Sequence, residues 1–253
     1  DANHGFAFPA ISLALSEITK TCKSFGIAAA SISRSHHFGQ AGRHVERLAE
    51  DGLIGLMFGN TPKAIPPWGG TQALFGTNPI AFASPRDSAV PLVIDMSLSK
   101  VARGKVMVAN QLNEKIPEDW AIDKDGKPTT DAKKALEGAM LPIGDAKGSA
   151  LALMVEVLAA GLTGSNFGFE ASSFLNAEGD APGVGQLIIA IDPSFFSGES
   201  FGERTETLVG AVLEQPGTRL PGDKRIEKRK VREKSETITI SKDLYEKIEL
   251  LIL

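Results

Sequence analysis

Apolar residues in the first sixty positions alternate between two spacings, and this alternation limits the fold more than any other feature. Residues 11–24 and 41–51 carry apolar side chains at helical spacing, whereas 27–32 and 53–58 are short, nearly continuous apolar runs. Helical periods that alternate with strand-length runs are typical of chains that pack helices against a sheet. We therefore expect an α/β or α+β fold, with helices over the first two segments and strands over the other two.

Glycine and proline interrupt this pattern between residues 62 and 91. Such punctuation predicts loops and short strands, for example over 80–83, and suits the walls of a ligand cleft. An apolar run over 91–96 then predicts a buried strand that ends in a carboxylate, and helical spacing follows over 99–110.

The second half of the core is predicted from two further apolar segments. Residues 149–162 are apolar all round, so we expect a helix that is buried on most sides. Residues 186–191 predict another buried strand. The polar segment 123–128 superficially resembles a calcium loop, but alanines stand where the first and last ligands belong, so we interpret it as a β-turn.

Composition favours a globular protein with a small-molecule partner. The 253 residues are 42% hydrophobic, enough for a sizeable core, and the net charge of -4 argues against a nucleic-acid or anionic-membrane surface. No run approaches the roughly 18 apolar residues of a membrane span. The single Cys22 excludes an internal disulfide and a cysteine-rich metal site, and its helical setting predicts a buried thiol. We expect a cytoplasmic protein.

The end of the chain is strongly basic. Six cations fall within residues 224–232, and an amphipathic stretch follows over 243–253. We divide the chain into a core, 1–222, and a charged helical arm, 223–253, which packs back on the core or on a partner subunit. The cations are either a solvated face or, at the start of the arm, a site for a phosphorylated cofactor.

Two of the four histidines stand together in the run Ser35-His36-His37-Phe38-Gly39. The run joins a predicted strand to a predicted helix, where α/β enzymes place reactive groups. Histidine changes charge near neutral pH, so one of the pair is a candidate for proton transfer, although a loop histidine is more often solvated or supports a neighbour.

Several familiar motifs are excluded. The string over 198–202 matches a nucleophile elbow, but no histidine follows His44 to complete a hydrolase triad. No Gly-x-Gly-x-x-Gly follows a strand, so an ordinary Rossmann site is unsupported. The segment 144–149 is not a P-loop, yet its glycines and lysine before an apolar helix could form an anion site with the helix dipole.

Seven blocks of the sequence, in order, resemble the malate/L-lactate dehydrogenase family of nicotinamide-dependent oxidoreductases. They are SHHFGQAG (35–42), PPWGG (66–70), LFGTNPIAF (74–82), VIDMSLS (93–99), VARGK (101–105), LPIGDAKGSALALMVEVLAAGLTG (141–164) and GQLIIAIDP (185–193). The resemblance implies a non-Rossmann fold with a mixed, largely antiparallel sheet flanked by helices. It also implies a homodimer that uses NAD or NADP.

The resemblance further implies the positions of a site. His37, the second histidine of its block, matches the residue that gives or takes a proton in several members. Cofactor contacts are implied at Thr61, at Asp95, Met96 and Ser97, at Ala146 and Lys147, and at Gly222, Asp223 and Lys224. His36 stands where many members carry Asn, so we expect it only to orient the loop.

Two departures from the family pattern stand out. Members usually carry Gly-Gly-His-Lys-Gly where this chain has an aspartate at 145 and Ala146, so the choice between NAD and NADP stays open. Members also begin with a helical segment that carries a His-Gly-x-x-Arg-type motif, which this chain lacks. We therefore expect a fragment or a processed chain.

Two functions follow from these observations. In the first, hydride passes between NAD(P)H and a small 2-oxo or 2-hydroxy acid, or a cyclic 2-imino acid, while His37 handles the proton. In the second, the chain is a catalytically incomplete member that binds a cofactor or a partner without turnover.

Overall fold

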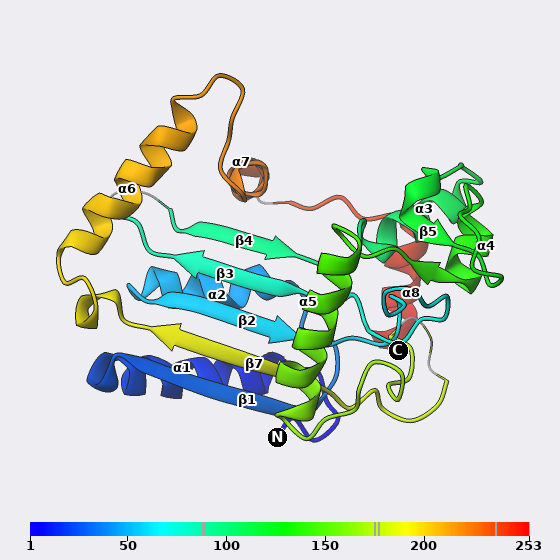
Figure 1. The fold of residues 1–253 in the computed structure, drawn as a ribbon, viewed down its shortest axis with the longest axis horizontal. Coiled ribbons are helices and arrows are strands. Elements are labelled where there is room, and N and C mark those ends of the chain that lie inside the picture. The colour runs from blue at the N-terminus through cyan, green and yellow to red at the C-terminus, as the bar shows by residue number, and fades with distance from the viewer. Residues whose placement is uncertain (88–89, 175, 177, 236, 253) are drawn as a thin grey trace.

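The computed structural model describes residues 1–87, 90–174, 176, 178–235 and 237–252. Its centre is a five-stranded sheet in the order β1-β7-β2-β3-β4 (Figure 1), and every pair of neighbours is antiparallel. The strands are β1 (Ile27–Ser35), β2 (Ile54–Gly59), β3 (Ile80–Ser84), β4 (Leu92–Met96) and β7 (Val184–Ile191). The predicted strands and the antiparallel character of the sheet are confirmed.

Two helices cover the back of this sheet (Figure 1). They are α1 (Phe8–Phe25) and α2 (Ala41–Glu50), at the predicted positions. Apolar side chains at helical spacing meet the inward-facing side chains of the strands to form one core cluster, and Cys22 is buried within it as predicted. Among its fully buried members are Ile11, Val45, Leu48, Met57 and Ile188.

The front of the sheet is crossed by α5 (Ala146–Glu156), which continues as a π-helical turn, η2 (Val157–Gly161). The prediction that this segment is buried on most sides is wrong. Small residues such as Ala152 and Ala159 face the sheet, whereas Leu153 and Val157 are 52% and 56% exposed. The segment is apolar on all sides because both its buried face, toward the sheet, and its exposed outer face carry apolar side chains.

A smaller lobe lies beyond the end of β4 (Figure 1). It comprises α3 (Arg103–Gln111), the short turn η1 (Glu118–Trp120), β5 (Ala121–Ile122), α4 (Ala132–Glu137) and β6 (Ala139–Met140). The predicted turn at 123–128 is present, because the Gly126 amide donates to the Asp123 carbonyl at 3.0 Å. The helix expected from residue 99 begins at Arg103, since Ser99 instead forms a β-bridge with Pro142.

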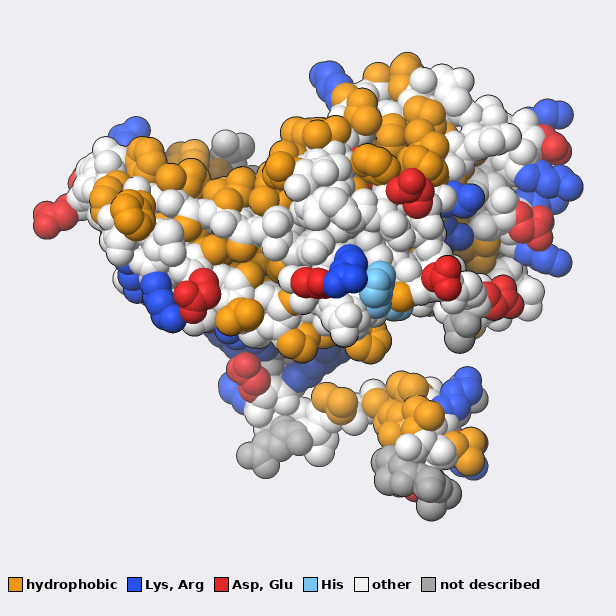
Figure 2. Space-filling model, turned by 90° about the horizontal axis from the view of Figure 1, so that it is seen from below, with side chains coloured by type: hydrophobic (Ala, Val, Ile, Leu, Met, Phe, Trp, Pro, Cys, Tyr) orange, Lys and Arg blue, Asp and Glu red, His pale blue; other side chains and the backbone are white. Residues whose placement is uncertain are grey.

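The last part of the chain follows β7. It contains η3 (Pro193–Phe195), α6 (Ser200–Leu213), α7 (Asp223–Ser235) and α8 (Lys242–Ile252). The helix α6, which the apolar pattern did not predict, is joined to the segment after β3 by two hydrogen bonds from Arg86 to Glu206. The helix α7 contacts α2 through Arg229 and Glu46. Figure 2 shows the C-terminal helix set apart from the main body.

Candidate functional site

A cavity of about 500 Å³ opens where the loops after β1 and β2 meet the start of α3. The segment 171–174 closes another side. Side chains of both the main body and the smaller lobe contribute to its wall: His37, Thr61, Lys63, Thr77, Arg103 and Phe174. In the described part of the chain, no aspartate or glutamate lines it. The cavity therefore carries cationic groups without a carboxylate to neutralise them.

His37 lies on the loop between β1 and α2, and backbone groups fix its ring. The Gly39 amide donates to Nδ1 at 2.9 Å. Because an N–H needs an acceptor, the neutral ring carries its own proton on Nε2. The ring of Phe174 meets the imidazole edge-on at a centroid distance of 5.4 Å. His37 can thus present an N–H donor to a ligand.

His36 holds the same loop in place. Its Nδ1 accepts a hydrogen bond from the His37 amide at 2.7 Å, and its ring stacks on Phe174 at 5.0 Å. Burial, and then the nearby charge of His37, lowers the pKa of His36. His44 of α2 fixes Phe38, the residue after His37, because its Nε2 lies 2.7 Å from the Phe38 carbonyl oxygen. These contacts support the expectation that His36 orients the loop.

Arg103 is a site residue that sequence reasoning missed. It is the first residue of α3, and its Nη1 and Nη2 reach the carbonyl oxygens of Lys63 and Leu136 only at 3.4 Å. Its Nε is buried with no partner among the described residues, and burial lowers the pKa of the guanidinium. The sequence did contain a signal for Arg103. A cation at a helix N-terminus interacts unfavourably with the helix dipole, which suggests that Arg103 is placed there to bind something.

Two threonines of the cavity wall are hydrogen-bonded to each other. The Thr77 amide donates to Thr61 Oγ1 at 2.9 Å, and the two hydroxyl oxygens lie 3.2 Å apart. Gly76 directly precedes Thr77, and a Cβ at this position would collide with the carbonyl oxygen and the hydroxyl of Thr61. Only glycine permits this close approach of the two loops. Thr61, which the family resemblance assigned to the cofactor, therefore shares the cavity of His37.

The buried carboxylate of Glu156 on α5 holds these loops from behind. It accepts hydrogen bonds from the Gly76 amide at 3.1 Å, the Asn78 side chain at 2.9 Å and the Gly168 amide at 3.0 Å. The Asn60 side chain donates at 3.4 Å. One side chain of α5 thus ties together three loops that are far apart in the sequence.

A second cavity, of about 400 Å³, gathers four of the predicted cofactor residues beside the end of β4: Asp95, Met96, Gly222 and Lys224. Asp95 accepts a hydrogen bond from the Gly42 amide at 2.8 Å. Arg225 also lines the cavity, and its Nε and Nη2 are buried without a partner in the described part of the chain. Such a guanidinium fits the phosphates of a nicotinamide dinucleotide.

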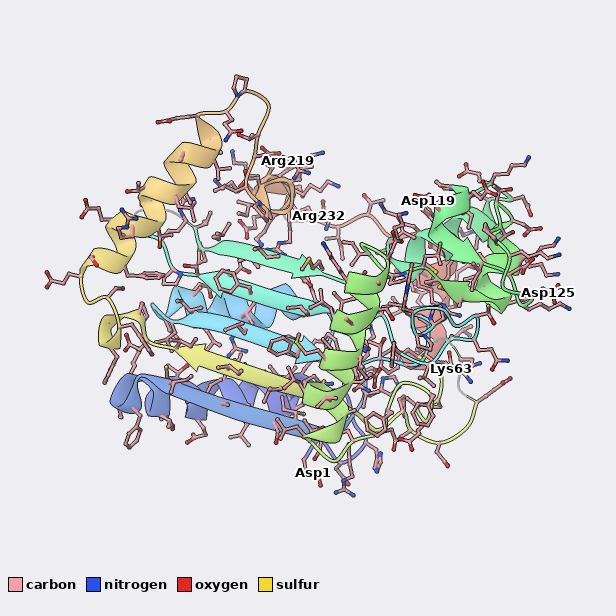
Figure 3. All side chains as sticks on the ribbon, viewed as in Figure 1. Asp1, Lys63, Asp119, Asp125, Arg219 and Arg232 are labelled. Atoms are coloured by element: carbon pink, nitrogen blue, oxygen red, sulfur yellow. The ribbon has the colours of Figure 1, made fainter. Side chains whose placement is uncertain are left out.

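A third cavity, of about 440 Å³, adjoins the second through Lys224 and Arg225, which line both. Its other cations come from the next turns of α7: Lys228, Arg229 and Arg232. Figure 3 shows Arg219 and Arg232 close to α7. The cations that the sequence placed on a charged arm therefore surround a concave surface.

The remaining predicted residues do not line these cavities. Ser97, Ala146 and Lys147 are not among the residues that line them. The Ile143 amide donates to the Leu98 carbonyl at 2.8 Å, so the segment after β4 lies beside the segment before α5. Asp223 accepts from the Leu220 amide at 2.9 Å and closes the turn before α7. Their cofactor roles stay predictions.

Among the residues that the structure describes, no group of three or more histidine, cysteine or acidic side chains is placed to hold a metal ion. In the same residues, no helix is both long and apolar enough to cross a membrane.

Comparison with known proteins gives consistent matches. The family described as Malate/L-lactate dehydrogenase matches residues 1–249. The chain is 55% identical over 240 residues to a (2R)-3-sulfolactate dehydrogenase (NADP(+)) of Chromohalobacter salexigens, covering 95% of this chain and 71% of that protein. It is 42% identical over 252 residues to a Delta(1)-pyrroline-2-carboxylate/Delta(1)-piperideine-2-carboxylate reductase of Pseudomonas putida, covering 99% and 74%.

Solved structures agree with these relatives. A delta1-piperideine-2-carboxylate reductase from Pseudomonas syringae superimposes with a TM-score of 0.89 at 41% identity, over 97% of this chain and 74% of that one. A sulfolactate dehydrogenase from Methanocaldococcus jannaschii gives 0.84 at 36% identity, over 93% and 69%.

Proposed function

The chain belongs to the malate/L-lactate dehydrogenase family and is an NAD(P)-dependent dehydrogenase or reductase, and on that premise we propose that the His37 cavity binds its acid substrate and that NADP is its preferred cofactor. The resemblance drawn from the seven sequence blocks is thus confirmed. One observation carries the proposal for the cavity: His37 and a poorly paired Arg103 share a space without an acidic side chain.

The proposed chemistry follows from the two side chains. Arg103 binds the acid group of the substrate, because a planar guanidinium matches a carboxylate or sulfonate with two hydrogen bonds. His37 Nε2–H then donates to the substrate oxygen or imine nitrogen at the reacting carbon. The bound nicotinamide supplies or accepts the hydride. To give its proton away, His37 must start with both nitrogens protonated, so the contact of Nδ1 with the Gly39 amide must loosen.

The preference for NADP rests on α7. The third cavity presents Lys228 and Arg232 beside Lys224 and Arg225, and Glu233 is the one acidic residue among the described residues that line it. The 2′-phosphate that distinguishes NADP from NAD is an anion suited to these cations. The (2R)-3-sulfolactate dehydrogenase relative is named for NADP as well.

The substrate is a 2-oxo or 2-hydroxy acid in our proposal, and a cyclic 2-imino acid is the second candidate. The relative at 55% identity is named for an acid that carries a hydroxyl. The reductase from Pseudomonas syringae, with its TM-score of 0.89, favours the imino acid. Arg103 would bind the carboxylate of either substrate.

We also propose that the chain forms a homodimer, because the outer face of α5 is apolar and exposed. Leu151, Leu153, Met154 and Val157 all lie on this face. Figure 2 shows apolar side chains gathered along that edge of the molecule. A second copy is the partner whose apolar face matches by symmetry. A cytoplasmic location stays a prediction from the sequence.

Cofactor titration followed by turnover tests this proposal. We expect nicotinamide fluorescence to report tighter binding of NADPH than of NADH. With 3-sulfopyruvate, pyruvate and Δ1-piperideine-2-carboxylate as substrates, His37→Gln should lower kcat by about a hundredfold or more. Arg103→Lys should raise KM for every acid by about tenfold, because lysine loses the paired hydrogen bonds.

Three results would contradict the proposal. Failure to bind either cofactor would favour the catalytically incomplete protein, and tighter binding of NADH would remove NADP preference. An unchanged KM in Arg103→Lys would remove Arg103 from the substrate site.

A further inference from the structure

We propose that Lys63 selects substrates that carry a second acid group, such as 2-oxo acids with a sulfonate or carboxylate on the next carbon. The inference rests on the proposed function of the His37 cavity and adds the residue that sets its specificity. It depends on three features of the described residues: the charge of the wall, the fixed backbone of Lys63, and the separate position of the cations near α7.

The cavity holds more positive charge than one carboxylate neutralises. Lys63 and Arg103 both line it, and no acidic side chain does so in the described part of the chain. The two residues are adjacent, because Arg103 Nη1 points at the Lys63 carbonyl oxygen from 3.4 Å. A ligand with a single acid group pairs with one of these cations, whereas a ligand with two acid groups pairs with both.

The backbone of Lys63 is held on both sides, so its side chain starts from a fixed place. Its amide donates to the Gly168 carbonyl at 2.8 Å, and the next residue, Ala64, donates to the Phe75 carbonyl at 2.7 Å. Gly168 is in turn bound to the buried Glu156 at 3.0 Å. Only the flexible stem of the lysine is free to adjust, and its ammonium can meet a tetrahedral sulfonate or a carboxylate as a point charge.

The phosphates of the cofactor are the other anions that Lys63 could bind. In our assignment, however, those phosphates are bound by other cations. Arg225 and Lys224 line the cavity with Asp95 and Gly222, and Lys63 does not line that cavity. Figure 3 shows Lys63 on the side of the smaller lobe, away from Arg219 and Arg232. A role for Lys63 toward substrate therefore predicts no effect on the affinity for NADPH.

The experiment compares substrates with one and two acid groups. In Lys63→Met, kcat/KM for 3-sulfopyruvate and oxaloacetate should fall by about tenfold to a hundredfold, because an ion-assisted hydrogen bond is lost. For pyruvate and Δ1-piperideine-2-carboxylate it should stay within about threefold, a change below 1 kcal/mol. Lys63→Arg should restore most of the loss. Lys124→Met, in the exposed turn of the smaller lobe, is the matched control.

Binding is measured in parallel, by the shift in melting temperature that sulfolactate, malate or lactate causes in the presence of NADPH. Lys63→Met should lose the shift from sulfolactate and malate and keep the shift from lactate. Equal losses for both substrate classes, no loss for the diacids, or weaker binding of NADPH would overturn the role of Lys63. If NADPH itself does not bind the wild type, the proposed function fails instead.

Discussion

Glu156 illustrates how a single buried residue can organise a site. Its side chain is 3% exposed, and no lysine or arginine pairs with it in the part of the chain that the structure describes. Four N–H groups from three loops satisfy it instead. A buried carboxylate without a cation is tolerated only when such donors replace the lost water. The positions of Thr61 and Thr77 in the cavity therefore depend on a residue that does not line it.

Glu156→Gln should destabilise the fold by about 2–3 kcal/mol, because the new amide NH₂ would face N–H donors. Urea unfolding measures the loss. We expect kcat/KM to fall as well, since both threonines would shift. Glu114→Gln, the same substitution at an exposed position just after α3, serves as a control that should change stability little. An unfolding free energy equal to that of the wild type would contradict the role assigned to Glu156.

The residues of the site fall into two groups: those that a short stretch of sequence indicates, and those whose role appears only in the structure. His37 and Thr61 carry local signals, because each follows a predicted strand and His37 also stands in a short block; the structure brings both into one cavity, and their roles stay predictions. Arg103 and Glu156 were not predicted. Their importance comes from burial and from partners that are distant in sequence, such as Leu136 for Arg103 and Gly76 for Glu156. No local pattern reports an unsatisfied nitrogen or a shared carboxylate.

At the scale of elements, an ion pair between Arg229 and Glu46 joins α7 to α2 in the part of the chain that the structure describes. Arg229 donates two hydrogen bonds to Glu46, at 3.0 and 2.9 Å, and Arg43 donates a third. Burial alone would raise the pKa of Glu46, but the bonds from the two arginines outweigh it and lower the pKa. The cations of the third cavity lie on this same helix. In the proposed NADP site, binding of the 2′-phosphate is thus expected to be coupled to the Glu46–Arg229 contact.

Arg229→Met should weaken NADPH binding and lower the unfolding free energy by about 1–3 kcal/mol at pH 7. Because the pKa of Glu46 is lower in the folded state, its stabilisation is complete above its ordinary value of about 4.3 and is lost as pH falls below it. The difference between wild type and variant should therefore shrink from pH 7 to pH 4. Chemical unfolding at both pH values measures it. Lys230→Met, on an exposed face of α7, is the control; a difference independent of pH would contradict the assignment.

Elements also show where a sequence pattern is ambiguous. The apolar segment around α5 predicted a helix but suggested the wrong environment, since hydrophobicity does not distinguish burial within one chain from a surface for another. The helix α6 was missed because only Val209 is buried along its 14 residues. Helices α1 and α2 were predictable because each buries one clear stripe.

At the scale of the whole molecule, the exposed face of α5 predicts the oligomeric state. Val157→Lys together with Leu153→Lys should yield a monomer, because two charges would be buried in an apolar interface. Light scattering after size-exclusion chromatography measures the mass. Leu208→Lys, on the exposed face of α6, is the control. A wild type that is monomeric at micromolar concentration would rule out the homodimer.

The order of the strands has a consequence for how the chain folds. The strand β7 lies between β1 and β2, so residues 184–191 separate two strands that are made more than a hundred residues earlier. Until β7 emerges from the ribosome, β1 and β2 each present an unpaired edge, and the sheet is split in two. Contacts of such high sequence separation fold slowly and leave edges open to aggregation. The strand that joins β1 to the rest of the sheet is thus also the last of the five to be synthesised, and its synthesis sets the earliest moment at which the sheet can close.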